Sequence, residues 1–333
     1  MDPTQRLKLG EYPTPVLAIE ALSSPHSQLW VKRDDLTHPG YGGNKVRKLE
    51  RLLATARAAG ATRLATVGAV GSHHVLATAY FGAQTGFAVE AVLFPQPRTP
   101  HSVEVVRAGL GLGLHAFAVS SPALAALFLG QRWLQGSWIV PPGGASVDGA
   151  MGYVDAAREL AVQVQRGLLP EPDVCVVALG SGGTAAGLAA GFAAERMKTR
   201  VVGVCVLSPT WAAAWAARAI ERACARRMGL SLDRTRRHAR LSIDTRFLGQ
   251  GYGYGTADGE AASRLAATHA ELELDPTYTA KAFAAALWHV RARRAACVLY
   301  WHTLSSAPMR PLLERAPNAE ALPVAIGRLL SPG

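Results

Sequence analysis

Cysteine is scarce in this chain: four residues are spread over 333 positions, without the paired spacing of a metal site. Cys175, Cys205 and Cys297 lie within apolar runs of strand character, so buried thiols are expected there. The fourth residue, Cys224, lies apart from the others. We therefore expect a reduced, cytoplasmic protein that contains no metal site.

Long apolar runs are also absent, although 49% of the residues are hydrophobic. No run reaches the roughly 18 residues that a membrane-spanning helix needs, because Arg, Asp, Gln or Glu interrupts each one. Positions 1–6 contain no apolar signal core, so nothing predicts export. A chain of this length and hydrophobicity can bury a large core, and we expect two lobes.

Acidic residues are outnumbered, which gives a formal net charge of +11. The densest basic stretch, residues 218–240, contains Arg218, Arg222, Arg226, Arg227, Arg234, Arg236, Arg237 and Arg240. The first three recur at helical spacing, as on one solvated helix face. Aromatic residues are absent from the stretch, and no zinc-finger or RNP-like pattern accompanies it. We predict no nucleic-acid partner; a solvated surface, or a rim that attracts anionic substrates, explains the charge better.

Short β-branched runs alternate with longer Ala- and Leu-rich helical patterns, and no repeats interrupt them. The predicted strands cover residues 29–31, 64–67, 89–94, 114–119, 174–179, 201–207 and 297–301. The predicted helices cover residues 44–59, 72–85, 99–109, 122–134, 148–167, 183–196, 209–228, 256–273 and 279–293. This alternation is typical of an α/β fold, with parallel sheets covered by helices on both faces. Ligands of such folds gather at the carboxyl ends of strands, so the glycine-rich turns there are candidate sites.

One such turn, Gly180-Ser181-Gly182-Gly183-Thr184, follows an apolar run and opens a helix of small residues. Glycines let backbone N–H groups converge on an anion, and the helix N-terminus favours negative charge. The hydroxyl groups of Ser181 and Thr184 can supply further donors. The turn therefore predicts a phosphate cradle.

The residues around this turn indicate which kind of phosphate-containing ligand it would bind. The spacing from Gly180 to Ala185 fits a loose dinucleotide fingerprint, which also needs an acidic residue after the next strand. That strand ends in Ser208-Pro209-Thr210, and no Gly-Lys-Ser/Thr ending of a P-loop is present either. A small phosphorylated cofactor remains.

A second glycine turn, Gly42-Gly43-Asn44, places Lys45 at the start of a predicted helix. Partial desolvation there would lower the pKa of the amine and make it nucleophilic, as Schiff-base chemistry requires. Taken alone, the turn could equally belong to a hairpin that carries an ordinary surface lysine. Combined with the cradle, it predicts a lysine that binds pyridoxal phosphate.

Nine short motifs extend this pattern, in order, along nearly the whole chain. They are YPTP (12–15), VKRDDL (31–36), GGNKVRKLE (42–50), GAVGSHH (68–74), PGG (142–144), GY (152–153), GSGGT (180–184), GYG (251–253) and DPTYTAK (275–281). Together they resemble the tryptophan-synthase-β-like (fold type II) pyridoxal-phosphate enzymes. The closer resemblance is to the D-cysteine desulfhydrase and 1-aminocyclopropane-1-carboxylate deaminase family.

The resemblance implies a two-lobed α/β fold in which each lobe is a mostly parallel twisted sheet with helices on both faces. The cofactor, pyridoxal 5'-phosphate, would lie between the lobes. Residues 1–47 plus 154–333 would form the large cofactor-binding domain, and residues 48–153 a small domain inserted in it. A homodimer is also implied.

The resemblance also implies roles for particular residues. Lys45 would form the Schiff base and move protons at the substrate carbon. Lys48 and the turn Gly180-Ser181-Gly182-Gly183-Thr184 would hold the phosphate. Ser72 would meet the substrate carboxylate or act at the reacting carbon, although Ser72 also suits a helix N-cap. His73 takes the place of an asparagine that contacts the phenolic oxygen of the cofactor, and His74 would line the substrate site.

The active-site tyrosines of the family fall on Tyr278 and on either Tyr252 or Tyr254. Tyr278 could alternatively serve only at a helix start. A hydroxyl group from Thr279 or Thr303 would face the pyridine nitrogen.

Two departures from the family pattern bear on activity. Besides His73, the segment Leu304-Ser305-Ser306 replaces two glycines, which should narrow the space around the pyridine ring. Thr279 stands where ring-opening deaminases have glutamate, and a hydroxyl partner leaves the pyridine a weaker electron sink. That suffices for elimination of a β leaving group.

We therefore predict a lyase that performs α,β-elimination on a small amino acid such as D-cysteine, giving pyruvate, ammonia and sulfide. The alternatives are a deaminase or β-replacement enzyme with an altered substrate, and an inactive homologue that binds the cofactor.

Overall fold

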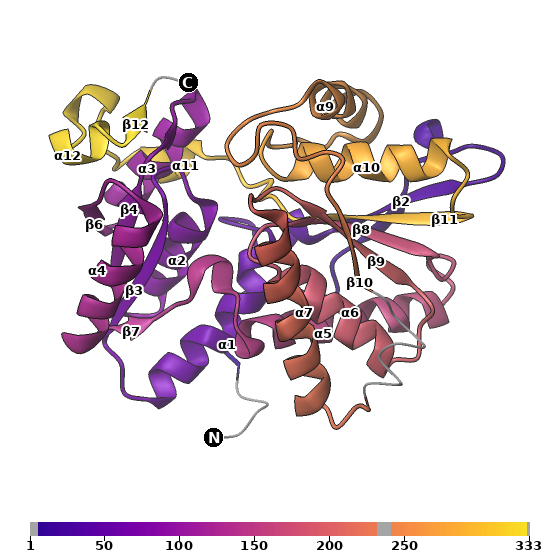
Figure 1. Ribbon diagram of the computed structural model, residues 1–333, viewed down its shortest axis with the longest axis horizontal. Helices are drawn as coiled ribbons and strands as arrows, with labels where there is room; N and C mark the ends of the chain where they lie inside the picture. The colour runs from indigo at the N-terminus through magenta and orange to yellow at the C-terminus, as the bar shows by residue number, and fades with distance from the viewer. Residues whose placement is uncertain (1–5, 232–240, 332–333) are drawn as a thin grey trace. The chain divides into compact units, whose positions relative to one another are not determined.

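The computed structural model describes residues 6–231 and 241–331, and the contacts within it divide the chain into two compact units. Unit 1 is built around Leu49–Gly144, with the segment that ends at Leu9 and the segment that begins at Pro308. Unit 2 consists of Gly10–Lys48 and Ala145–Ala307. Figure 1 labels the helices and strands of both units.

Unit 2 contains a six-stranded sheet in the order β1-β2-β11-β8-β9-β10. Its strands are β1 (Val16–Ala18), β2 (Gln28–Arg33), β8 (Val174–Leu179), β9 (Arg200–Cys205), β10 (Leu241–Asp244) and β11 (Cys297–His302). Only the β1–β2 pair is antiparallel. The carboxyl ends of the five parallel strands therefore share one edge of the sheet.

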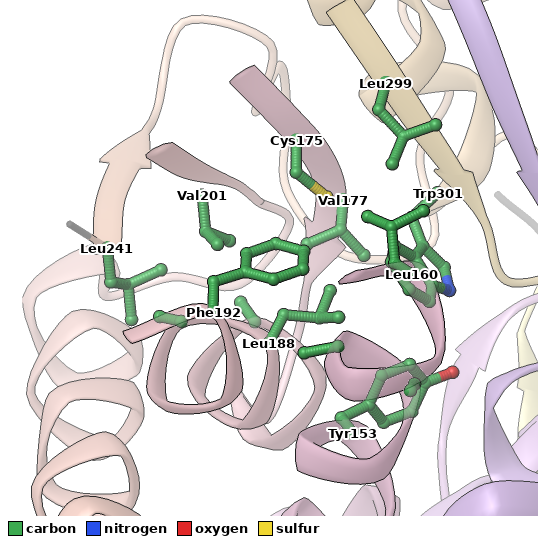
Figure 2. Packing of buried hydrophobic residues seen from close by; sticks show 14 of the residues in the cluster. Tyr153, Leu160, Cys175, Val177, Leu188, Phe192, Val201, Leu241, Leu299 and Trp301 are labelled. Carbon is green, nitrogen blue, oxygen red and sulfur yellow. The ribbon is translucent and has the colours of Figure 1, made fainter. Parts of the chain in front are cut away.

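Helices cover both faces of this sheet. They are α5 (Val147–Gln165), α6 (Gly183–Ala194), α7 (Thr210–Arg227), α9 (Ala257–Ala270) and α10 (Thr279–Arg291). In Figure 1, α9 and α10 lie over one face and α5, α6 and α7 over the other. Side chains of β8 alternate accordingly: Val176 packs in the cluster with Phe283 of α10, and Val177 in the cluster with Phe192 of α6 (Figure 2).

Unit 1 contains a parallel four-stranded sheet in the order β6-β4-β3-β7. Its elements are β3 (Arg63–Ala69), β4 (Ala88–Phe94), β6 (His115–Ala118), β7 (Trp138–Ile139), α2 (His73–Gln84), α3 (Pro100–Gly111) and α4 (Pro122–Leu134). The chain end adds α11 (Arg310–Leu313), α12 (Val324–Gly327) and β12 (Leu330–Ser331), which pairs with β5 (Gln96–Pro97). Helix α1 (Asn44–Ala58) begins in unit 2 and continues into unit 1.

The predicted α/β fold with two mostly parallel sheets is confirmed, and every predicted strand and helix overlaps an observed one. Among the described residues, the strands and α-helices that prediction missed are β1, β5, β7, β10, β12, α11 and α12. Each has two to four residues, too few to show a period in the sequence. All four cysteines are free and buried, as expected for thiols in apolar runs. No helix in residues 6–231 and 241–331 is long and apolar enough to cross a membrane.

Candidate functional site

Lys45 is the second residue of α1, directly after the turn formed by Gly42 and Gly43. Gly43 has φ +89°, and a Cβ there would lie 2.7 Å from the backbone oxygen of Thr303. Glycine is therefore required at this position on both steric and conformational grounds. The backbone N–H of Asn44 donates to the same Thr303 oxygen at 3.1 Å, which fixes the start of α1 against the end of β11.

The amine of Lys45 is directed by its neighbour Asn44. Lys45 Nζ donates to Asn44 Oδ1 at 2.7 Å, and Asn44 Nδ2 donates to Thr184 Oγ1 at 3.1 Å. This chain of contacts brings Lys45 to the turn that begins α6. Because Thr184 Oγ1 accepts here, its own proton can still be donated to a ligand.

The turn before α6 has the geometry of an anion cradle. Gly182 is the N-cap residue in the left-handed conformation, with φ +85°, and a Cβ there would lie 2.7 Å from Ala217 Cβ. A Cβ at Gly183 would lie 3.5 Å from Lys48 Nζ, and one at Gly180 would lie 3.0 Å from Tyr278 Cε1. Side chains at Gly180 and Gly183 would therefore fill the space between the turn, Lys48 and Tyr278. Ser181 is partly exposed in the same turn.

Two desolvated lysines give this region its electrostatic character. Burial lowers the pKa of Lys45 to about 8, and Asp275 partly opposes the shift. Burial and the nearby charge of Lys45 hold the pKa of Lys48 well below its ordinary value. A phosphate group at the N-terminus of α6 would add negative charge close to both amines. The side chains and the glycine turn therefore fit a small phosphorylated cofactor that bears an amine-reactive group.

Two tyrosines lie beside the cradle. The rings of Tyr252 and Tyr278 meet edge to face, with centroids 5.7 Å apart, and their side chains share a hydrogen bond. Burial raises the pKa of both hydroxyl groups, so both carry their protons near neutral pH. Tyr254, the alternative to Tyr252 in the sequence, is 39% exposed.

Asp275 organises the start of α10 and was not identified as a functional residue from the sequence. Its carboxylate accepts the backbone N–H groups of Thr277, Tyr278 and Thr279, and also the Thr279 hydroxyl at 2.6 Å. The hydroxyl proton of Thr279 is therefore used by Asp275, whereas Thr303 stands at the end of β11 beside Gly43. An aspartate four residues before the first residue of a helix is the one sequence signal for this role.

His302, the last residue of β11, is buried beside Tyr300. Its Nδ1 lies 3.0 Å from the Tyr300 hydroxyl oxygen, which also lies 3.4 Å from the backbone oxygen of Thr279. Burial lowers the pKa of His302 to about 4, which keeps the ring neutral near pH 7. Nε2 has no partner among the described residues.

The residues that replace two glycines after β11 support the first glycine turn. Ser305 Oγ accepts the backbone N–H of Gly42 at 2.9 Å. Ser306 Oγ donates to Asp35 Oδ2 at 2.6 Å. Both hydroxyl groups thus hold the chain just before Lys45.

A fully paired ionic cluster lies at the base of α1 in unit 2. Asp34 is completely buried, and its carboxylate accepts hydrogen bonds from Thr14, Arg47, Tyr153 and Trp301. Arg47 also donates to Glu159, which in turn accepts from Lys32. Burial alone would raise the pKa of Asp34, but Arg47 and the other donors hold it below its ordinary value. The polar atoms of Tyr153 and Trp301 lie on the same side of their apolar cluster (Figure 2).

Ser72, His73 and His74 belong to unit 1. Ser72 precedes α2 without capping it through its side chain, and a Cβ at Gly68 would lie 2.7 Å from Ser72 Oγ. His74 Nε2 lies 2.8 Å from Thr66 Oγ1, which donates to the Val140 oxygen, so the imidazole is the donor. His74 is thereby tied to β3 and is buried.

His73, the departure from the family pattern, is paired with a second histidine. Its Nε2 lies 2.6 Å from Nε2 of His101, the second residue of α3. One nitrogen must donate and the other accept, so the pair shares a single proton between these two atoms. Sequence reasoning did not find His101, because nothing local to residue 101 indicates a partner 28 positions away.

Two further predictions concern residues outside the site. Arg218, Arg222 and Arg226 lie on α7, and Arg227 forms an ion pair with Asp148. Arg234, Arg236, Arg237 and Arg240 lie outside the described residues. Within residues 6–231 and 241–331, no group of three or more His, Cys, Asp or Glu side chains could hold a metal ion.

Comparison with known proteins gives consistent results. The family model described as "Pyridoxal-phosphate dependent enzyme" matches residues 7–298. The chain is 34% identical to D-cysteine desulfhydrase of Serratia proteamaculans (strain 568) over 313 residues, 90% of this chain and 93% of that protein. It is also 34% identical to D-cysteine desulfhydrase of Klebsiella pneumoniae (strain 342) over 293 residues, 84% of this chain and 86% of that protein.

Solved structures show the same fold. A crystal structure of an ACC deaminase homologue aligns with a TM-score of 0.79 at 28% identity, covering 93% of this chain and 96% of that chain. A crystal structure of O-ureido-L-serine synthase aligns with a TM-score of 0.63 at 16% identity, covering 95% and 97%. At that identity the second match shows the fold alone.

Proposed function

Because this chain belongs to the pyridoxal-phosphate-dependent enzymes, within the D-cysteine desulfhydrase and ACC deaminase family, we propose that it is a lyase performing α,β-elimination. Its substrate is a small amino acid with a β leaving group, D-cysteine or a close relative. The products from D-cysteine are pyruvate, ammonia and sulfide. The observation that carries this proposal is Lys45, a desolvated amine beside a glycine cradle and a second buried lysine.

The residues around Lys45 would hold the cofactor by its negatively charged phosphate group. Lys48 and the backbone N–H groups of the turn that includes Gly182 and Gly183 bind the phosphate, and Thr184 adds a hydroxyl donor. Asn44 keeps the amine of Lys45 directed toward this turn. When bound, pyridoxal phosphate withdraws electrons from the α-carbon of an amino acid and makes the α-proton acidic.

Lys45 is the base that takes this proton. With a pKa of about 8, a substantial fraction of its amine is neutral near pH 8, and its conjugate acid can return the proton later. As the α C–H bond breaks, the C–S bond of D-cysteine also breaks, and its electron pair leaves with the sulfur as hydrosulfide. Water then converts the unsaturated amino acid to pyruvate and ammonia.

Tyr252 assists the leaving group as a hydrogen-bond donor. Its raised pKa keeps its proton in place, and a departing sulfur anion is a weaker base than a tyrosine phenolate. Tyr252 would therefore keep the proton and stabilise the negative charge that develops on sulfur through a hydrogen bond. Tyr278, which shares a hydrogen bond with Tyr252, orients it.

The preference for elimination over ring opening is supported by Thr279. Ring opening places more demand on the pyridine ring as an electron sink, and a carboxylate at the ring nitrogen helps meet it. Thr279 carries no carboxylate, and its hydroxyl proton is used by Asp275. The 34% identical relatives are named D-cysteine desulfhydrases, which agrees with elimination.

A substrate screen tests the proposal. Purified protein with added pyridoxal phosphate is incubated with D-cysteine, L-cysteine, D-serine, cysteate or aminocyclopropanecarboxylate, and keto acid, ammonia and sulfide are measured. We expect equal amounts of pyruvate and sulfide from D-cysteine, and at least about a hundredfold slower release of both from Lys45→Ala. Tyr252→Phe should retain the visible band of the bound cofactor but release sulfide more slowly, whereas the exposed Tyr254→Phe should match the unmodified protein.

The other outcomes identify the alternatives. A four-carbon keto acid from aminocyclopropanecarboxylate, with D-cysteine inert, would mean a deaminase. Loss of D-cysteine with formation of a new thioether in the presence of an added thiol would mean β-replacement. Cofactor binding without turnover of any of these substrates would favour an inactive homologue.

A further inference from the structure

A groove of about 570 Å³ lies in unit 2, outside the Lys45 region. Its walls come from the start of β9, the end of β10 with the residues that follow, and the end of α10. Arg200, the first residue of β9, pairs in register with Val174 at the start of β8, whereas the glycine cradle follows the end of β8. From Arg200 the groove follows the edge strand β10 to Asp244, which pairs with Val204 of β9, so this end of the groove lies two strands away from the end of β8.

The groove carries positive charge that the described residues do not balance. Its single carboxylate, Asp244, is already used: it accepts Arg246 Nε at 3.0 Å and Arg246 Nη2 at 2.6 Å. The Arg246 guanidinium also stacks 3.6 Å from the centre of the Trp288 ring. Arg200 and Arg294 are exposed, and neither guanidinium has a hydrogen-bond or carboxylate partner among the described residues.

His289, on α10, also lines the groove. It is 4% exposed, and neither ring nitrogen has a hydrogen-bond partner in the part of the chain that the structure describes. Burial, Arg200, Arg246 and Arg294 lower its pKa to about 4, against the opposing effect of Asp244. A buried imidazole without hydrogen bonds lowers the free energy of unfolding. A ligand that forms a hydrogen bond with the ring would offset this cost.

We propose that this groove is an anion site, which binds the phosphate or carboxylate group of a small molecule between Arg200 and Arg294. Guanidinium groups match such oxyanions because they offer paired N–H donors in a plane. A bound anion would also offset the three positive charges around His289, so the ring could take up a proton and become a donor. One ligand would thus balance the charge and supply a hydrogen-bond acceptor for the buried ring.

His289 provides a readout that is independent of any enzymatic activity. In the holoprotein, its ring C–H resonances are followed against pH by NMR, with inorganic phosphate, acetate or chloride added at equal ionic strength. The cofactor is first fixed by borohydride reduction, so the glycine cradle is filled. We expect the His289 midpoint to rise from about 4 with phosphate or acetate, and to stay unchanged with chloride.

Substitution of the arginines tests the geometry. Arg200→Gln and Arg294→Gln should each weaken binding of the effective anion about tenfold or more, since each removes a charged hydrogen-bond donor. Arg291→Gln on the same helix end changes the net charge equally, but Arg291 does not line the groove, so binding should be retained.

Comparison of phosphate with acetate shows which group the site prefers. A His289 midpoint that responds equally to chloride, or an affinity that falls as much in Arg291→Gln as in Arg200→Gln, would overturn the proposal. Because the readout does not involve turnover, failure of the proposed lyase activity would not affect this result.

Discussion

Two groups of buried charges in unit 2 differ in how they are paired. In the cluster at the base of α1, Asp34 forms an ion pair with Arg47, and Glu159 forms ion pairs with both Arg47 and Lys32. On the same turn of α1 as Arg47, the amines of Lys45 and Lys48 are also desolvated, but Lys45 donates its hydrogen bond to the neutral oxygen of Asn44. The lysines and arginine of both groups come from the same short segment, residues 32–48, whereas Glu159 comes from α5.

The difference in pairing shifts the pKa values of the two groups of charges in different ways. In the cluster, opposite charges keep Asp34 ionised and raise the pKa of Arg47 well above its ordinary value, despite the burial of both groups. At the site, burial prevails and the pKa of Lys45 falls to about 8. A paired buried charge stabilises one arrangement of the chain. A poorly paired buried lysine instead has a lowered pKa, so its neutral, nucleophilic form is available for chemistry.

Removal of the reactive amine should have the largest effect. Lys45→Ala should lower turnover about a hundred- to ten-thousandfold, because the base that moves the α-proton is gone. Its absorption spectrum should lack the visible band that borohydride reduction removes in the unmodified protein. A persisting yellow, borohydride-reducible adduct in the variant would refute the role of Lys45.

Breaking the paired cluster should affect stability rather than chemistry. Asp34→Asn leaves Arg47 without its buried partner and should lower the free energy of unfolding by about 3–5 kcal/mol, measured by urea denaturation. The matched control is Glu195→Gln, which removes an exposed ion pair with Arg158 and should cost less than about 1 kcal/mol. Equal costs for the two variants would contradict the structural role of the cluster.

Loss of the second site lysine should weaken cofactor binding while Lys45 remains. Lys48→Gln removes one charged donor to the phosphate, so we expect the affinity for pyridoxal phosphate to fall about ten- to a hundredfold. Equilibrium dialysis of the apoprotein measures this loss. Pyridoxal, which has no phosphate, serves as the control ligand, and an equal loss of its affinity would argue against phosphate binding by Lys48.

The reactivity of Lys45 should follow its lowered pKa. Since the folded-state value of about 8 lies below the ordinary 10.5, the amine loses its proton at lower pH than an ordinary lysine. Acetylation of the apoprotein, followed by peptide mass spectrometry from pH 6 to 10, should show half-maximal labelling of Lys45 near pH 8. A Lys45 profile that rises in step with that of the exposed Lys198 would show that the site does not lower its pKa.

Local patterns explain what could be predicted from the sequence. The turn before Lys45 was recognisable because Gly43 needs a positive φ, and the cradle because Gly182 does. Period-two and helical patterns located the elements that carry both turns, since each is long enough to show its period. The sequence shows that His73 and Ser305 depart from the family pattern. It does not show that they contact His101 and Gly42, which lie far away along the chain.

The sequence by itself thus determined the α/β fold, the two glycine turns and the lysine that follows one of them, because these depend on neighbouring residues. Only the tertiary structure decided which charges are paired. Arg47 meets Glu159 across 112 positions of the chain, and Asp275 acts on Lys45 from the start of α10. Such pairings follow from how strands and helices pack in space, so the same segment supplies one arginine for stability and, two residues earlier, one lysine for chemistry.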